Sequence, residues 1–114
     1  PLMERWLDLY HAVVKQNGAD ADAGRRIPAW LRASGFHNAE LTGDSKLYTG
    51  TNAQFWGETW SERTLKSSFG QQAIQYNLST PEEIKNIGAS WKEWSENEDA
   101  CFAFVQVQAI ATKE

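Results

Sequence analysis

The sequence predicts a mostly helical α+β domain that contains two β-strands. Apolar residues recur at helical spacing over most of the chain, whereas they alternate with a period of two in only two segments. Leu, Ile, Val and Phe are scarce for a globular chain of 114 residues, and six Trp and three Tyr supply the missing apolar mass. The core of this domain is therefore expected to be aromatic.

Residues 1–36 are expected to form two helices. In residues 2–16 the apolar side chains make one stripe at helical spacing, and Asn17-Gly18 is a pair that commonly ends a helix. Residues 23–34 carry a second apolar stripe, and Gly35 is expected to end that helix.

Residues 38–48 and 101–112 are predicted to be β-strands because their side chains alternate in character. The first segment has one polar face, which is typical of a half-buried strand. The second has apolar residues on both faces, which is typical of a strand in the interior of a sheet. Two strands alone make a marginal hairpin. This pattern therefore indicates that part of the sheet lies outside this chain.

Residues 52–95, between the two strands, are predicted to be helical. Gly70 is a weak point in the first part and is expected to divide it into two helices. Thr80 is the predicted N-cap of the last helix, with Pro81 at its first position and Glu83 completing a capping box.

Composition and charge exclude several classes of function. The net charge of −4 and the lack of a Lys/Arg cluster argue against a nucleic-acid partner. No apolar run approaches the ~20 residues of a membrane span, and no signal peptide is visible. The single Cys101 fits a reducing, cytoplasmic location, and two His with one Cys at wide spacing make no recognisable metal site. Because the chain begins with Pro1 rather than Met, we expect a fragment of a longer protein.

Two pairs of tryptophans lie at helical spacing, Trp56 with Trp60 and Trp91 with Trp94. Such aromatic side chains could line a pocket for a sugar or another flat ring. Helical spacing is also the pattern of core packing, which is the more common role. Both interpretations stay open at this point.

Two further patterns have both a functional and a structural interpretation. His11 lies beside Tyr10 and could transfer a proton, although an exposed helical histidine is the usual case. Arg25-Arg26 begin the second helix, where the helix dipole disfavours cations, so either an anionic ligand or a salt bridge to Asp20 or Asp22 is expected to compensate. The residues alone therefore predict a mixed helix/strand domain without an obvious catalytic site.

Three short motifs carry a resemblance to a known family. They are W-L-D-L-Y from Trp6, A-G-R-R followed ten residues on by A-S-G-F, and S-F-G-Q-Q-A from Ser68. With them, nearly the whole chain from about Trp6 onwards resembles the C-terminal part of class I S-adenosylmethionine (SAM)-dependent methyltransferases. The similar enzymes are of the ubiquinone/menaquinone-biosynthesis type, also called methyltransferase type 11.

The resemblance implies an α+β fragment of an α/β Rossmann-like fold. Residues 38–48 and 101–112 would be the antiparallel strand pair at the end of a doubly wound sheet, and residues 52–95 would be a helical insertion that covers the substrate side. The family binds SAM through a glycine-rich turn and an acidic residue that match nothing in this chain. SAM is therefore expected to bind a missing N-terminal half.

The function implied is the substrate-side segment of a methyltransferase that acts on a small molecule and is not competent as this chain alone. No residue is assigned to catalysis, cofactor binding or metal binding. The candidate residues for the methyl acceptor are Trp6, Tyr10, His11, Arg25, Trp56 and Trp60. The chain is expected to self-associate, as a dimer for example, or to pair with the missing half. The alternatives are a non-enzymatic, self-associating interaction module and a binder of a small ligand or carbohydrate.

Overall fold

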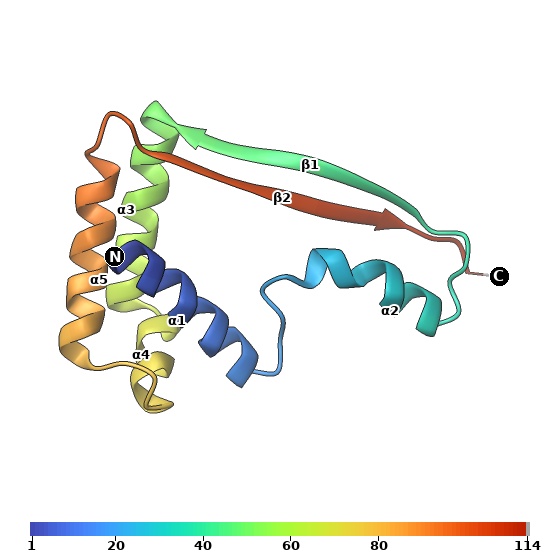
Figure 1. The fold of residues 1–114 in the computed structure, drawn as a ribbon, viewed down its shortest axis with the longest axis horizontal. Coiled ribbons are helices and arrows are strands. Elements are labelled where there is room, and N and C mark those ends of the chain that lie inside the picture. The colour runs from blue at the N-terminus through green and yellow to red at the C-terminus, as the bar shows by residue number, and fades with distance from the viewer. Residues whose placement is uncertain (114) are drawn as a thin grey trace. The chain divides into compact units, whose positions relative to one another are not determined.

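The structure is a computed structural model that describes residues 1–113. Its elements, in chain order, are α1 (Leu2–Gln16), the short 3₁₀ helix η1 (Ala23–Arg26), α2 (Ile27–Ala33), β1 (Glu40–Thr49), α3 (Gly50–Lys66), α4 (Ser68–Gln75), α5 (Pro81–Ser95) and β2 (Cys101–Ile110). The mostly helical fold with one antiparallel strand pair is confirmed (Figure 1). Among the described residues β1 and β2 pair only with each other, so these residues do not form a Rossmann-like sheet.

The chain divides into two compact units. The first, called here the helical unit, consists of Pro1–Ala21 and Tyr48–Phe102 and contains α1, α3, α4 and α5. The second, called here the strand unit, consists of Asp22–Leu47 and the described residues from Ala103 onwards. It contains η1, α2 and most of both strands.

The helical unit has a core rich in tryptophan, as the composition predicts. The buried side chains come from all four helices and are Trp6, Leu9, Val13, Trp60, Ala73, Ile84, Ile87 and Trp91. Their spacing along α1 and α5 gives each helix one apolar stripe, and these stripes meet in the core. Burial of these aromatic and aliphatic side chains stabilises the unit.

The two helices expected in residues 1–36 are present, with one difference. The second begins as the 3₁₀ turn η1 and becomes α-helical only at Ile27. Pro28 therefore lies in the first turn of α2, where its missing N–H removes no helical hydrogen bond. Gly35 ends the helix with a φ of +90°, and the Phe36 N–H donates to the Leu31 carbonyl at 2.8 Å.

The long helix between the strands breaks at Ser67 and not at Gly70. Ser67 has an extended backbone, with a ψ of 178°, and separates α3 from α4. Gly70 is buried inside α4, where a Cβ atom would overlap the Thr64 carbonyl oxygen and crowd the Ile84 side chain. The glycine therefore permits a close approach between α4 and its neighbours, and helix propensity alone did not reveal this role. The helical segment also begins earlier than predicted, at Gly50.

The predicted N-cap of α5 is present, and its glutamate has a further role. Thr80 Oγ1 accepts a hydrogen bond from the Glu83 N–H at 3.1 Å. The Glu83 carboxylate accepts bonds from the Arg5 guanidinium at 2.9 and 3.1 Å and from the Ser79 hydroxyl at 2.6 Å. Arg5 also donates to the Leu78 carbonyl, so this network joins α1 to the start of α5. The hydrogen bonds from Arg5 and then Ser79 lower the pKa of Glu83 below its ordinary value.

Replacing Glu83 with Gln is expected to lower the free energy of unfolding at neutral pH and to have a smaller effect in acid. The pKa of Glu83 is lower in the folded state, so its stabilisation is complete above the unfolded-state pKa and is lost as the pH falls through the folded-state pKa. Urea unfolding at about pH 7 and about pH 3 measures the difference. Glu82→Gln is the control, because Glu82 lies in the same helical turn and makes no ion pair among the described residues. An identical pH response of the two variants would contradict this role of Glu83.

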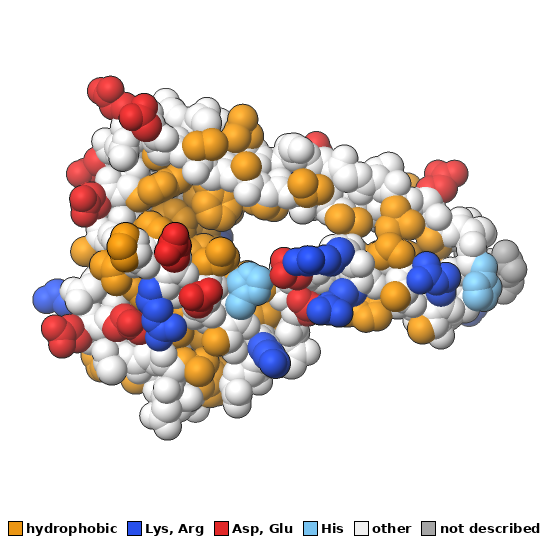
Figure 2. Space-filling model, in the orientation of Figure 1, with side chains coloured by type: hydrophobic (Ala, Val, Ile, Leu, Met, Phe, Trp, Pro, Cys, Tyr) orange, Lys and Arg blue, Asp and Glu red, His pale blue; other side chains and the backbone are white. Residues whose placement is uncertain are grey.

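The strand unit contains no buried side chain among its described residues. Exposed apolar residues occupy both strands, and Figure 2 shows hydrophobic side chains at the surface. The largest exposed fractions are 76% for Ile110, 66% for Val105 and 61% for Leu47. Cover is local: η1 packs on β2 where a Cβ on Gly24 would lie 3.0 Å from Val107. β2 thus carries apolar side chains on both faces, as the sequence indicates, but among the described residues it pairs with β1 alone and not with the further strand that this pattern predicts.

No helix among residues 1–113 is long and apolar enough to cross a membrane.

Candidate functional site

Nine aromatic side chains of the helical unit are in contact with one another. This aromatic cluster consists of Trp6, Tyr10, Tyr48, Trp56, Trp60, Phe69, Trp91, Trp94 and Phe102. The residues come from α1, α3, α4, α5 and from the ends of both strands. The cluster therefore joins segments that are far apart in the sequence.

The inner part of the cluster is formed by three buried tryptophans. Trp6 lies edge-to-face with Trp60 and with Trp91, at centroid distances of 4.8 and 4.9 Å. Trp60 and Trp91 lie nearly parallel, 6.2 Å apart. Edge-to-face pairs place the positive edge of one ring against the negative face of the next, which adds about 0.5–1.5 kcal/mol per pair to the burial term.

The outer part of the cluster is half-buried and is called here the aromatic rim. It consists of Tyr10, Tyr48, Trp56, Phe69 and Phe102. Tyr48 stacks on Trp56 with a centroid distance of 4.2 Å and an interplanar angle of 18°, and Phe102 lies 5.3 Å from Trp56. These rings offer partly exposed apolar faces, which suit contact with a flat or apolar group.

The rim lies at the carboxyl end of β1. Tyr48 is the penultimate residue of β1, and α3, which carries Trp56, follows directly at Gly50. Phe102 lies at the start of β2, so the antiparallel pairing brings it to the same end of the strand pair (Figure 1). Backbone pairing and the chain turn after Thr49 therefore position three of the five rim residues.

The structure separates the six predicted binding residues into groups. Tyr10 and Trp56 belong to the rim and are half-buried, whereas Trp6 and Trp60 are buried in the inner part of the cluster. His11 is exposed, with its ring 6.3 Å from that of Tyr10. Core packing is thus the role of Trp60, and the stacking interpretation remains for Trp56.

Arg25 belongs to the strand unit, and the other five predicted residues belong to the helical unit. Its guanidinium donates to the Asp22 carboxylate at 3.0 Å, and the Arg25 side chain is 77% exposed. The salt bridge is the compensation expected for a cation at a helix N-terminus. An exposed pair of this kind contributes little to stability.

Tyr48 and Phe102 were missed by sequence reasoning. Tyr48 alternates onto the polar face of its strand, and Phe102 reads as one more apolar residue of a two-faced strand. The available signal was their position, because each lies within two residues of the strand end that adjoins the helical segment. Aromatic residues at that junction are candidates for a shared site.

The rim holds no carboxylate, and no group of three His, Cys, Asp or Glu within residues 1–113 could hold a metal ion. The described residues do not fit SAM, because a nucleotide-type site of this kind needs a glycine-rich turn between a strand and a helix. Among the described residues β1 is the strand that is followed directly by a helix, and its junction with α3 carries a single glycine, Gly50.

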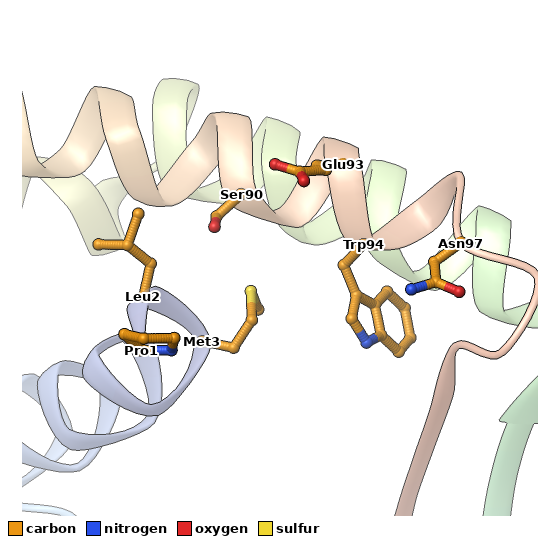
Figure 3. A pocket seen from close by; sticks show the side chains of 7 residues that line it. All are labelled: Pro1, Leu2, Met3, Ser90, Glu93, Trp94 and Asn97. Carbon is orange, nitrogen blue, oxygen red and sulfur yellow. The ribbon is translucent and has the colours of Figure 1, made fainter.

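A second concave feature of the helical unit is an open groove of about 410 Å³ between the first turn of α1 and the end of α5. Its lining residues are Pro1, Leu2, Met3, Ser90, Glu93, Trp94 and Asn97. Met3 and Trp94 extend into the space between the two helices (Figure 3). The groove has an apolar floor and an exposed polar margin, with no polar group held in a buried position.

No family model, curated protein or solved structure matches the chain. The interpretation of function therefore depends on the sequence motifs, the strand pair and the aromatic rim.

Proposed function

We propose that this chain is the C-terminal, substrate-side segment of a cytoplasmic, class I SAM-dependent methyltransferase that acts on a small molecule. In this proposal the strand pair completes a doubly wound sheet, and α3–α5 form a helical insertion over the acceptor. SAM binds the N-terminal half of the enzyme and supplies the methyl group. The residues described here bind and orient the acceptor and exclude water from it.

The observation that carries the proposal is a strand pair without a core. β1 and β2 are ten residues long, which is longer than the usual strand, yet no side chain of the strand unit is buried among the described residues. An exposed strand pair with apolar side chains on both faces is unfavourable in water. Extension of the sheet by further strands and helices would cover these side chains.

The distribution of charge indicates which strand would lie inside the larger sheet. β1 contains Glu40, Asp44 and Lys46, and charged residues are typical of an edge strand. β2 contains no charged residue over its ten positions. In the proposed sheet β2 therefore lies between β1 and an earlier strand, and β1 forms the outer edge.

The position of the rim supports a role on the substrate side. In open α/β sheets, ligands bind outside the carboxyl ends of the parallel strands. In the proposed sheet β1 has the direction of the parallel strands, because β2 is the antiparallel one. Tyr48 and Trp56 would then lie at the ligand-binding edge, where their stacked rings can position a small acceptor.

The proposal is tested on the natural gene product, in parallel with the 114-residue chain. S-adenosylhomocysteine is expected to bind the natural product in a calorimetric titration and not to bind the chain alone. Failure of the natural product to bind, or binding of similar strength by the 114-residue chain, would reject the proposal.

In the natural gene product, Trp56→Ala is expected to raise the KM for the acceptor, or to lower kcat, by about tenfold, from loss of one stacking surface. Phe55→Ala is the matched control, because Phe55 precedes Trp56 in α3, is 67% exposed and makes no ring contact with the cluster among the described residues. Equal kinetics of the two variants would show that the rim does not bind the acceptor.

The exposed strands also favour a second candidate, a self-associating interaction module. Both candidates predict that the isolated chain associates, and sedimentation at several concentrations is expected to show a rising mean mass. Val105→Lys should reduce this association, because Val105 is 66% exposed on β2. Leu7→Lys on α1 is the control, with a 48% exposed leucine outside the strands. If the 114-residue chain is a monomer at every concentration, the prediction is contradicted. If the natural gene product associates and binds no S-adenosylhomocysteine, the second candidate is favoured.

A further inference from the structure

We propose that, when a radical one-electron oxidant removes an electron from one of its tryptophans and is itself reduced, the aromatic cluster conducts this oxidising equivalent to the rim tyrosines Tyr10 and Tyr48. The cluster would thereby deliver one-electron oxidation damage from the core to residues that solvent reductants can repair. This inference concerns the helical unit alone and does not depend on the methyltransferase proposal.

The first argument is continuity of ring contact. Electron transfer between aromatic side chains slows steeply with separation, so rings in contact exchange electrons far faster than isolated ones. From Trp91 one route passes through Trp6, at 4.9 Å, to Tyr10, at a further 5.4 Å. Another connects Trp60 to Trp56, at 6.2 Å, and Trp56 to Tyr48, at 4.2 Å. Every step on both routes joins neighbouring rings.

The second argument is the state of the inner indole N–H groups. Those of Trp6, Trp60 and Trp91 are buried and have no hydrogen-bond acceptor among the described residues. A tryptophan radical cation becomes a long-lived neutral radical by losing this proton. With no acceptor in reach the proton stays, and a buried positive charge in an apolar core is costly. The oxidising equivalent is therefore driven toward the rim.

The third argument is the chemistry at the tyrosines. The tryptophan radical cation takes one electron from a tyrosine, and the phenol releases its proton to water as it is oxidised. The products are neutral tryptophan, a neutral tyrosyl radical and one proton. Tyr10 and Tyr48 are both half-buried, so each is in ring contact with the cluster and also exposes part of its surface to solvent. A thiol or an enediol reductant then restores the phenol by donating a hydrogen atom.

Pulse radiolysis tests this transfer, with the azide radical as a one-electron oxidant that is selective for tryptophan. The protein carries Trp30→Phe, because Trp30 lies in the strand unit, is 49% exposed and would otherwise react directly. We expect tyrosyl absorption to grow as tryptophanyl absorption decays. The rate constant should be independent of protein concentration, since the transfer is intramolecular. A rate proportional to protein concentration would overturn the proposal.

Three tyrosine variants locate the end of the route. Tyr10→Phe combined with Tyr48→Phe should abolish the intramolecular growth phase, and each single variant should reduce its amplitude. Tyr76→Phe is the matched control: its hydroxyl donates to Asn17 and its ring makes no ring contact with the cluster. A growth phase that survives the double variant, or that disappears in Tyr76→Phe, would overturn the proposal. Near-ultraviolet circular dichroism of each variant confirms that the aromatic packing is unchanged.

Discussion

Replacing Trp91 with Ala is expected to lower the free energy of unfolding by about 3–5 kcal/mol. Trp91 is 1% exposed and contacts Trp6, Trp60, Trp94 and Phe102 through its ring. Truncation removes the transfer energy of an indole and leaves a cavity that rigid neighbouring rings cannot fill. Because small domains are stable by only about 5–15 kcal/mol, this variant is expected to lose a large fraction of its stability and to unfold at a lower temperature.

Urea unfolding followed by far-ultraviolet circular dichroism measures the effect of Trp91→Ala. The control is Trp30→Ala, which removes the same side chain from α2, where it is 49% exposed, and should cost about 1 kcal/mol or less. A loss at Trp91 no greater than that at Trp30 would mean that the aromatic cluster is not the stabilising core.

Replacing Gly57 with Ala is expected to destabilise the helical unit by about 1–3 kcal/mol, although alanine is the better helix former. An added Cβ at Gly57 would lie 2.6 Å from the Cβ of Ser95 and 3.0 Å from its Cα. These atoms belong to or adjoin the backbone of α5, so α3 and α5 would have to move apart. Separation of the two helices would also loosen the contact between Trp91 and Trp60.

Gly88→Ala is the matched control for Gly57→Ala, because it tests the same helix pair from the other side. The three atoms nearest to an added Cβ at Gly88 are all in the Leu65 side chain, namely Cγ and the two Cδ atoms, at 2.5–3.0 Å. Leu65 is 48% exposed and can rotate toward solvent, so the cost is offset by about 0.8–1 kcal/mol of helix propensity. Chemical denaturation of both variants should therefore show a loss at Gly57 and little change at Gly88. Equal losses at the two positions would contradict this explanation.

The helical part of the fold was predictable because local chemistry determines it. The apolar stripe of α1 and the cap formed by Thr80 and Pro81 depend on residues within a few positions of each other. The break at Ser67 was not predictable in this way. Its poor helix propensity makes Gly70 the expected break. The requirement for a glycine at this position comes instead from the close contact with the Thr64 carbonyl, which depends on how α4 packs.

The candidate site was predictable only in part, for a related reason. Spacing identified Tyr10 and Trp56 as aromatic residues of helices, but the same spacing also selected Trp60, which is core. Whether a helical tryptophan faces solvent or a neighbour depends on which elements pack against it. Phe102 belongs to the rim because of the pairing of β1 with β2, which no local pattern specifies.

The lack of buried side chains in the strand unit has a consequence for how the chain opens and closes. Regions with few buried apolar contacts unfold locally at low free energy, whereas a packed core opens only with global unfolding. Amide hydrogens of β1 and β2 should thus exchange with solvent long before those of α3 and α5. Any element that packs on the strands would slow that exchange. The rate of deuterium uptake in β1 and β2 therefore reports directly on whether another strand or helix covers the sheet.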